Sequence, residues 1–178
     1  MEFRTSKPSD YISIVIPYVF PVESTPSIRH EILEFLASEI PDEEVREFLL
    51  TFLSLSIECR NRHQLAAILT GVGSNGKGVL KNLMEETLGL YHNEPSAQFL
   101  TSEKLSDESL CPNLVRLKAK RSVFMSEPEQ GRKMNGAFLK FITGKDIIQA
   151  RNLNSKGYVK YKPRFTPVLL CNAIPKID

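Results

Sequence analysis

One segment limits what this chain can fold into more than any other, the glycine-rich run GVGSNGKG at residues 71–78. It holds two glycines separated by four residues and followed by a lysine, which is the spacing of a phosphate-binding loop. Such a loop needs glycines because its backbone N–H groups must point inward at the phosphates. The helix that follows must aim its N-terminus at the same anion. The run therefore predicts a strand, a loop and a helix in that order.

The flanking residues agree with this prediction. A short apolar run at 65–69 precedes the loop, and residues 77–88 carry apolar side chains at helical spacing. We expect Lys77 to reach the β- and γ-phosphate oxygens of ATP, and the alternative is a structural glycine turn. The expected nucleotide-binding residues are Gly71, Gly73, Ser74, Asn75, Gly76, Lys77, Gly78 and Val79.

Gly78 departs from the pattern, because the residue after the lysine is usually a Ser or Thr that ligates Mg²⁺. Metal binding must then rely on other groups or on water, or be weakened. The apolar run 122–126 predicts a buried strand, and Glu127 and Glu129 follow it as candidate metal-binding acids. Asn172 follows a third apolar run, 168–171, where its amide can sense the γ-phosphate or orient water. A solvated strand end and a turn-forming asparagine are the alternatives.

Charge is divided unevenly along the chain. Residues 1–110 hold 9 Lys and Arg against 17 Asp and Glu, whereas residues 111–178 hold 14 against 4. Basic residues with interleaved tyrosines are concentrated at 145–164, around an expected hairpin whose turn is 154–157. This composition suits single-stranded nucleic acid, and a solvated surface is the alternative. We expect Arg151, Lys156 and Lys160 to bind it, with Lys156 at the tip, although Arg151 could equally brace the base of the hairpin.

Several classes of protein are not expected. No apolar stretch approaches the roughly 20 residues that a membrane-spanning helix needs, and the N-terminus lacks the order of a signal peptide. The three cysteines are far apart, without a CxxC pair, which argues against a disulfide framework or a zinc site. We therefore expect a chain that is not secreted and has no membrane partner, with the cysteines buried.

Four sequence segments, in this order, carry a resemblance to a known family: GVGSNGKG, RSVFMSEPEQG, LKFITGKDIIQAR and FTPVLLCNAIP. The chain resembles the superfamily 3 helicase domain of the poxvirus-type primase-helicases of large DNA viruses and phages. The resemblance covers residues 27–178. It implies an AAA+-like P-loop NTPase of three-layer α/β/α architecture. By position, Lys77 matches Walker A, Glu127 and Glu129 match the Walker B acids, and Asn172 matches the sensor asparagine of motif C.

The same resemblance implies an ATP-dependent DNA helicase that uses ATP and Mg²⁺. Its partners would be single-stranded DNA gripped by a pore hairpin, further copies in a hexameric ring, and replication proteins. The place of action would be the host cytoplasm, at a viral replication site, or the bacterial cytoplasm. We expect three parts: an arm or upstream remnant at 1–26, a helical segment at 27–62, and a core at 63–178 that is truncated at its C-terminus.

Two departures leave other readings open. Gly78 lacks the metal-ligating hydroxyl, and the sequence contains no match to the catalytic arginine that the family implies downstream. We therefore expect a fragment, a split gene product or a decayed copy. One alternative is a non-catalytic DNA-binding or assembly remnant of such a helicase. A small-molecule kinase with a phosphate loop is less favoured, because it should ignore DNA.

Overall fold

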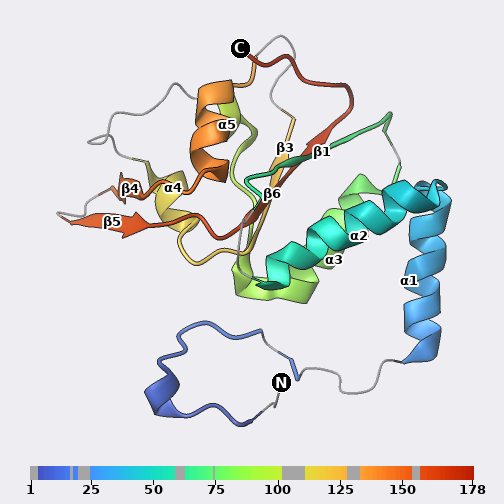
Figure 1. Ribbon diagram of the computed structural model, residues 1–178, viewed down its shortest axis with the longest axis horizontal. Coiled ribbons are helices and arrows are strands. Elements are labelled where there is room, and N and C mark those ends of the chain that lie inside the picture. The colour runs from blue at the N-terminus through green and yellow to red at the C-terminus, as the bar shows by residue number, and fades with distance from the viewer. Residues whose placement is uncertain are drawn as a thin grey trace.

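Four parallel strands form the central sheet of the computed structural model, which describes residues 4–16, 18–19, 25–58, 63–73, 75–101, 111–127, 133–153 and 157–178. The strand order is β1-β6-β3-β2, so the last strand in sequence lies between the first and the third (Figure 1). The strands are β1 (Ala67–Thr70), β2 (His92–Asn93), β3 (Ser122–Ser126) and β6 (Thr166–Cys171). Because all four run in parallel, their carboxyl ends meet at one edge of the sheet.

Helices cover both faces of this sheet. The α-helices are α1 (Pro26–Glu39), α2 (Glu43–Glu58), α3 (Lys77–Leu88), α4 (Pro112–Arg116) and α5 (Gly136–Thr143). Short 3-10 helices occur at η1 (Pro8–Asp10), η2 (Gly89–Tyr91) and η3 (Ala97–Thr101). A proline after a threonine predicts a helix start, and Pro26 does begin α1. Lys77 begins α3, and the Asn135 side chain caps α5 by accepting from the Phe138 N–H at 2.9 Å.

Two separate hydrophobic cores show why the fold has three layers. Phe124 of β3 faces the core formed with α1, α2 and α3, whereas Val123 and Met125 face the core formed with α4 and α5. Strand β6 divides in the same way, with Val168 on one side and Leu169 on the other. A strand covered on both faces reads as a continuous apolar run. The three-layer α/β/α architecture predicted from the sequence is confirmed.

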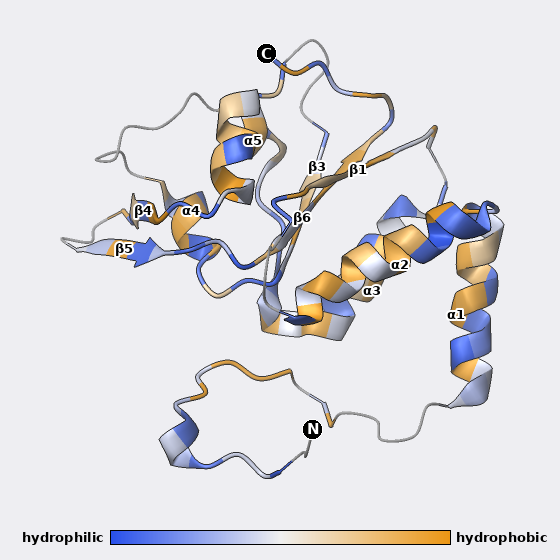
Figure 2. Ribbon diagram, viewed as in Figure 1, coloured by the Kyte–Doolittle hydropathy of each residue, from blue (hydrophilic) through white to orange (hydrophobic). Residues whose placement is uncertain are grey.

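A second, smaller sheet lies beside the first. Strands β4 (Ile148–Arg151) and β5 (Tyr158–Tyr161) pair antiparallel, with Arg151 opposite Tyr158 and Ile148 opposite Tyr161. This is the predicted hairpin, and its mixed hydrophilic and hydrophobic colouring contrasts with the mainly apolar strands of the main sheet (Figure 2). Residues 154–156 of its turn, including Lys156, lie outside the described residues.

The structure also corrects some details. The sequence predicts that the Thr25 hydroxyl caps the helix that follows it, but in the described part of the chain this side chain makes no capping hydrogen bond. The helical spacing of the apolar residues at 45–53 predicts that Val45 and Phe48 lie on the buried face of their helix, but they are 53% and 63% exposed. Strand β2, η3 and α4 lie in a stretch for which the sequence predicted no element.

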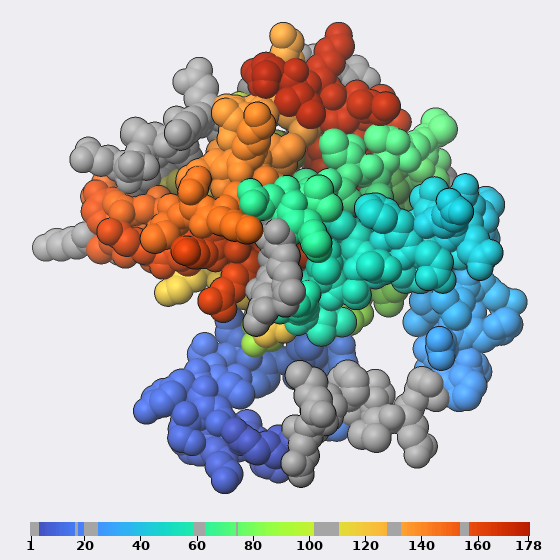
Figure 3. All heavy atoms as spheres, viewed as in Figure 1, coloured from blue at the N-terminus to red at the C-terminus, as the bar shows by residue number. Residues whose placement is uncertain are grey.

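The N-terminal arm borders the main body (blue in Figure 3). Two hydrogen bonds tie it there, from the Tyr18 hydroxyl to the Thr87 carbonyl and from the Tyr91 hydroxyl to the Ile14 carbonyl. The helices described by the structure include none of the length and apolar character needed to cross a bilayer. Cys111 and Cys171 are buried free thiols, as expected, and Cys59 lies outside the described residues.

Candidate functional site

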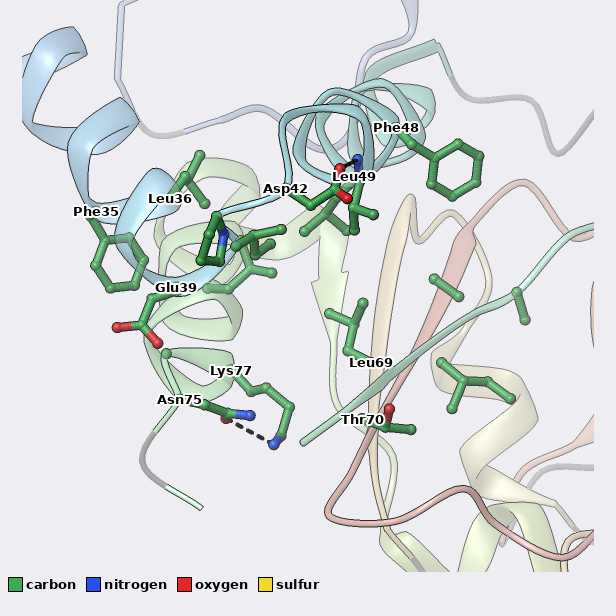
Figure 4. A pocket seen from close by; sticks show the side chains of 18 residues that line it. Phe35, Leu36, Glu39, Asp42, Phe48, Leu49, Leu69, Thr70, Asn75 and Lys77 are labelled. Atoms are coloured by element: carbon green, nitrogen blue, oxygen red, sulfur yellow. Dashed lines mark hydrogen bonds between the residues drawn. The ribbon is translucent and has the colours of Figure 1, made fainter. Parts of the chain in front are cut away.

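The glycine-rich loop joins β1 to α3, and its Lys77 side chain is hydrogen-bonded to other residues of the same loop. The Lys77 ammonium donates to the Gly71 carbonyl at 2.6 Å. It also donates to the Asn75 side-chain oxygen at 2.8 Å (Figure 4). An ammonium group has three donors, so these two bonds hold the charge at the loop without exhausting it. Ser74 of the same loop lies outside the described residues.

Two glycines of the loop cannot be replaced without strain. Gly71 has φ +153°, and a Cβ there would lie 2.2 Å from the Asn75 side-chain nitrogen. Gly76 has φ +72°, and its Cβ would lie 2.7 Å from the Cγ of Glu39. Positive φ is a conformation that glycine adopts without the steric cost of a side chain. A Cβ at Gly78 would meet no atom of the described residues within 4 Å, so these residues leave room for a side chain at that position.

A cavity of about 600 Å³ opens beside this loop. Helices α1 and α2 form one wall with apolar side chains such as Phe35, Leu36 and Leu49, and β1 forms the other. Figure 4 shows Asn75 and Lys77 at one end of the cavity and Glu39 near them. The apolar residues of these two helices recur at helical spacing, which predicts elements that pack on a core but does not predict their part in a cavity next to the loop.

Glu127 and Asn172 lie together at the carboxyl edge of the sheet. The Asn172 backbone N–H donates to the Glu127 carboxylate at 2.7 Å. Strands β3 and β6 pair with Ser126 opposite Leu170, which brings the residues just after them to neighbouring positions. The pattern of a phosphate loop followed by an acid at a strand end predicts that the two strands are neighbours, but β6 lies between β1 and β3. Asn172 therefore follows the strand that lies between the loop and the acid.

The buried thiol of Cys171 reports the charges around this edge. Burial is the main cause that raises its pKa to about 11, and the negative charge of Glu127 raises it further. The positive charge of Lys77 acts in the opposite direction. The two charged groups of this edge thus act on the pKa of the same thiol with opposite sign.

One further acidic residue, Glu94, lies at the same edge and was not predicted from the sequence. Glu94 follows β2, accepts a hydrogen bond from the Ser126 hydroxyl at 3.2 Å and pairs with Lys81 of α3 at 2.9 Å. Lys81 lies one helical turn after Lys77, so this ion pair ties the helix of the phosphate loop to the strands that precede Glu127. Strand β2 is only two residues long, which is too short to leave a pattern in the sequence.

The residues present fit ATP better than they fit a closely held metal ion. A loop with a lysine before a helix N-terminus can accept a triphosphate. For Mg²⁺, which prefers oxygen ligands and keeps several waters, the described residues supply the Glu127 carboxylate. Glu129 lies outside them, and among the described residues no group of three or more His, Cys, Asp or Glu side chains could hold a metal ion.

The hairpin presents a second candidate site. Because opposite residues of an antiparallel pair share a face, the register places Gln149, Arg151, Tyr158 and Lys160 on one side of the ribbon. Ile148 and Ala150, on the other side, belong to the core. Two of the expected nucleic-acid-binding residues, Arg151 and Lys160, thus share the outward face.

Comparisons with known proteins agree with these observations. The chain is 35% identical over 176 residues, 98% of its length, to a protein named as a putative helicase in Acanthamoeba polyphaga mimivirus. It is 36% identical over 150 residues, 83% of its length, to a protein with the same description in Frog virus 3. A putative primase of African swine fever virus is 28% identical over 126 residues, 70% of this chain and 13% of that protein. No model of a known protein family matches the chain.

The chain spans 18% and 15% of the length of the two helicase-named relatives. Among solved structures, the apo form of the C-terminal region of NrS-1 is similar, with a TM-score of 0.68 and 20% identity. That alignment covers 89% of this chain and 36% of the other one. At this identity the likeness concerns the fold, and it agrees with a P-loop NTPase-like architecture.

Proposed function

Because the chain belongs to the primase-helicase family of large DNA viruses and phages, within its superfamily 3 helicase domain, we propose that it binds Mg-ATP and single-stranded DNA. In the complete protein these two events would be coupled, so that ATP hydrolysis drives translocation along the strand and unwinding of the duplex. The loop with Lys77 and the edge with Glu127 and Asn172 would serve the nucleotide. The outward face of the hairpin would serve the DNA.

One observation carries the nucleotide part of the proposal. Three parts of the chain meet at one sheet edge, where a lysine closes a glycine loop and an asparagine N–H fixes a carboxylate. We propose that Lys77 exchanges its bonds to the loop for bonds to phosphate oxygens. Charge-assisted bonds of this kind are stronger than those between neutral groups.

Glu127 would hold the water shell of Mg²⁺ or accept a proton from the attacking water. Asn172 would then contact the γ-phosphate through its amide side chain, because its backbone N–H is engaged with Glu127. Bound Mg²⁺ would neutralise charge that develops on the phosphates. The apolar cavity beside Lys77 suits the base of the nucleotide.

The test is a calorimetric titration of Mg-ATP into the complete chain and two variants. Lys77→Ala should weaken binding by about 100-fold, the loss typical of a strong bond to a charged group. Lys81→Ala is the matched control, since Lys81 lies one turn further along the same helix and pairs with Glu94. It should bind within a few-fold of the unchanged chain. Equal affinity of Lys77→Ala and the unchanged chain would remove the loop from the proposal.

Inorganic triphosphate in the same titration examines the cavity. If the base lies against the apolar wall, ATP should bind more tightly than triphosphate alone. Equal affinities would place the base elsewhere.

Gly78 favours a second candidate, a chain that binds DNA or assembles with partners without hydrolysing ATP. A folded chain that binds single-stranded DNA but gives no heat with Mg-ATP would support this reading. The proposed helicase role of the complete family member includes assembly into a ring. Sedimentation of the chain with and without ATP and an oligonucleotide examines that part separately.

A further inference from the structure

The hairpin carries two tyrosines near its basic residues, and the structure gives them opposite surroundings. Tyr161 points to the core side, where its hydroxyl donates to the Leu114 carbonyl of α4. Burial strongly raises the pKa of this phenol. Tyr158 lies on the outward face and is 44% exposed. Of the two rings, Tyr158 is therefore the one that can meet a ligand.

Arg151 lies against this exposed ring. Its guanidinium carbon is 5.8 Å from the centre of the Tyr158 ring, within the range of a cation–π contact. Its backbone carbonyl accepts from the Cys111 N–H at 3.1 Å, and its Nε atom is buried without a hydrogen-bond partner among the residues that the structure describes. The backbone of Arg151 is thus tied to Cys111, and its half-buried side chain lies against the tyrosine ring rather than reaching freely into solvent.

Lys160 completes the outward face in a different way. It is exposed and lies opposite Gln149, two residues along the strand from Tyr158. Residues two apart on a strand share a face about 7 Å apart, a separation that suits a base and its own backbone phosphate. The outward face thus presents an aromatic ring and a cation side by side along β5.

We infer that Tyr158 is a base-stacking residue for single-stranded DNA, held in position by Arg151, while Lys160 supplies the adjacent phosphate contact. This inference rests on the proposed DNA binding and adds the mode of contact. Stacking on an aromatic ring tolerates any base, because every base has a π face. Arg151 is accordingly a positioning residue. In a duplex the base faces are already stacked, so this contact selects single strands.

The experiment compares two oligonucleotides of equal length, oligo-dT and a strand of abasic sugar-phosphate units, by fluorescence anisotropy with the complete chain. Tyr158→Leu should weaken binding of oligo-dT by about 5- to 100-fold. Tyr158→Phe should retain most of the affinity, because it keeps the ring. On the abasic strand the unchanged chain and Tyr158→Leu should bind equally, since there is no base to stack.

The salt dependence of DNA affinity distinguishes the contribution of the Tyr158 ring from that of the Lys160 charge. Lys160→Gln should lower the slope of log affinity against log salt by about 0.7, the value for one phosphate contact on a single strand. Tyr158→Leu should leave that slope unchanged. Arg151→Lys keeps the charge but loses the planar group over the ring, and it should weaken oligo-dT more than the abasic strand.

A second measurement does not depend on any variant. Irradiation of the unchanged chain with an oligonucleotide that contains 5-iodouracil should crosslink a stacked aromatic residue, and peptide mapping should find Tyr158. Crosslinking elsewhere, or equal loss by Tyr158→Leu on both strands, would overturn the inference while leaving DNA binding intact. If the unchanged chain bound neither strand, the proposed DNA binding itself would fail, and the inference with it.

Discussion

The two candidate sites are built in opposite ways. The nucleotide edge draws Lys77, Glu127 and Asn172 from three distant parts of the sequence and holds them through strands that are hydrogen-bonded in parallel. The outward face of the hairpin consists of Arg151, Tyr158 and Lys160, which lie within ten residues of one another in sequence. The antiparallel pairing of β4 with β5 is enough to bring them together. A site that must enclose a triphosphate depends on the whole sheet. A site that lies along a strand of DNA needs only a ribbon with the correct face outward.

The largest expected effect comes from loosening the sheet itself. Phe124 of β3 is fully buried in the core that this strand forms with α1, α2 and α3. Phe124→Ala should therefore lower the free energy of unfolding by about 3–5 kcal/mol. Phe48→Ala is the control, because Phe48 is 63% exposed, and it should cost less than about 1 kcal/mol. Urea unfolding followed by circular dichroism measures both. Similar losses for the two variants would mean that the buried sheet does not set the stability.

Glu127→Gln isolates the chemistry of the nucleotide edge. The amide retains an oxygen that can accept from Asn172, but it loses the charge and the capacity to take up a proton. ATP hydrolysis in a single turnover should fall by about 100-fold or more, while Mg-ATP affinity changes little. Glu94→Gln is the control, since Glu94 pairs with Lys81, and it should retain most of the rate. A Glu127→Gln chain that hydrolyses ATP at the unchanged rate would contradict the assignment.

Gly78→Ser adds to the phosphate loop the hydroxyl that it lacks, and it tests whether the nucleotide site can be changed without affecting the hairpin. The position has room for a Cβ, and a hydroxyl there could ligate Mg²⁺. We expect ATP affinity to rise by about tenfold in the presence of Mg²⁺ and to stay constant in EDTA. Gly78→Ala is the control, because it stabilises the helix by about 0.5–1 kcal/mol without offering an oxygen. DNA binding by the hairpin should be the same in both variants. Equal gains for serine and alanine would exclude a metal contact.

The smallest expected effect is a pH dependence of folding stability that originates at one histidine of the main sheet. Burial lowers the pKa of His92 in β2 below its ordinary value of 6.5; Lys81 and Lys120 lower it further, and Glu85 and Glu94 oppose them. The unfolded chain therefore binds the proton more readily, so stability is fully present above about pH 6.5 and is lost as pH falls. Thermal unfolding between pH 7.5 and 5.5 measures this slope. His92→Gln should flatten it, and an equal slope in the variant would assign it to other groups.

The sequence predicted most clearly those elements that are buried on both sides. Strand β3 and helix α3 have the predicted bounds, because a continuous apolar run and a helical period each match one kind of element. Strand β2 was missed because two residues cannot show a period. Phe48 was placed in a core because periodicity defines a face of a helix, but not how far the neighbouring elements extend over it.

The candidate site was predictable as a set of residues but not as a geometry. The motif identified Lys77, and strand ends identified Glu127 and Asn172, yet the order of the strands that joins them depends on long-range pairing. Glu94 escaped notice because its partners, Lys81 and Ser126, lie 13 and 32 positions away in sequence. The different environments of Tyr158 and Tyr161 likewise follow from register and the packing of α4, which alternating residues alone do not reveal.

Strand β1 has a practical consequence for anyone who handles this chain. Among the described strands it pairs with β6 alone, so its outer backbone groups can bond to another extended peptide. Leu65 and Ile68 beside that edge are 47% and 36% exposed. Exposed edges with apolar neighbours recruit further strands and lead to aggregation. Concentrated solutions should therefore tend to precipitate, and a short peptide that occupies this edge would act as a solubilising agent.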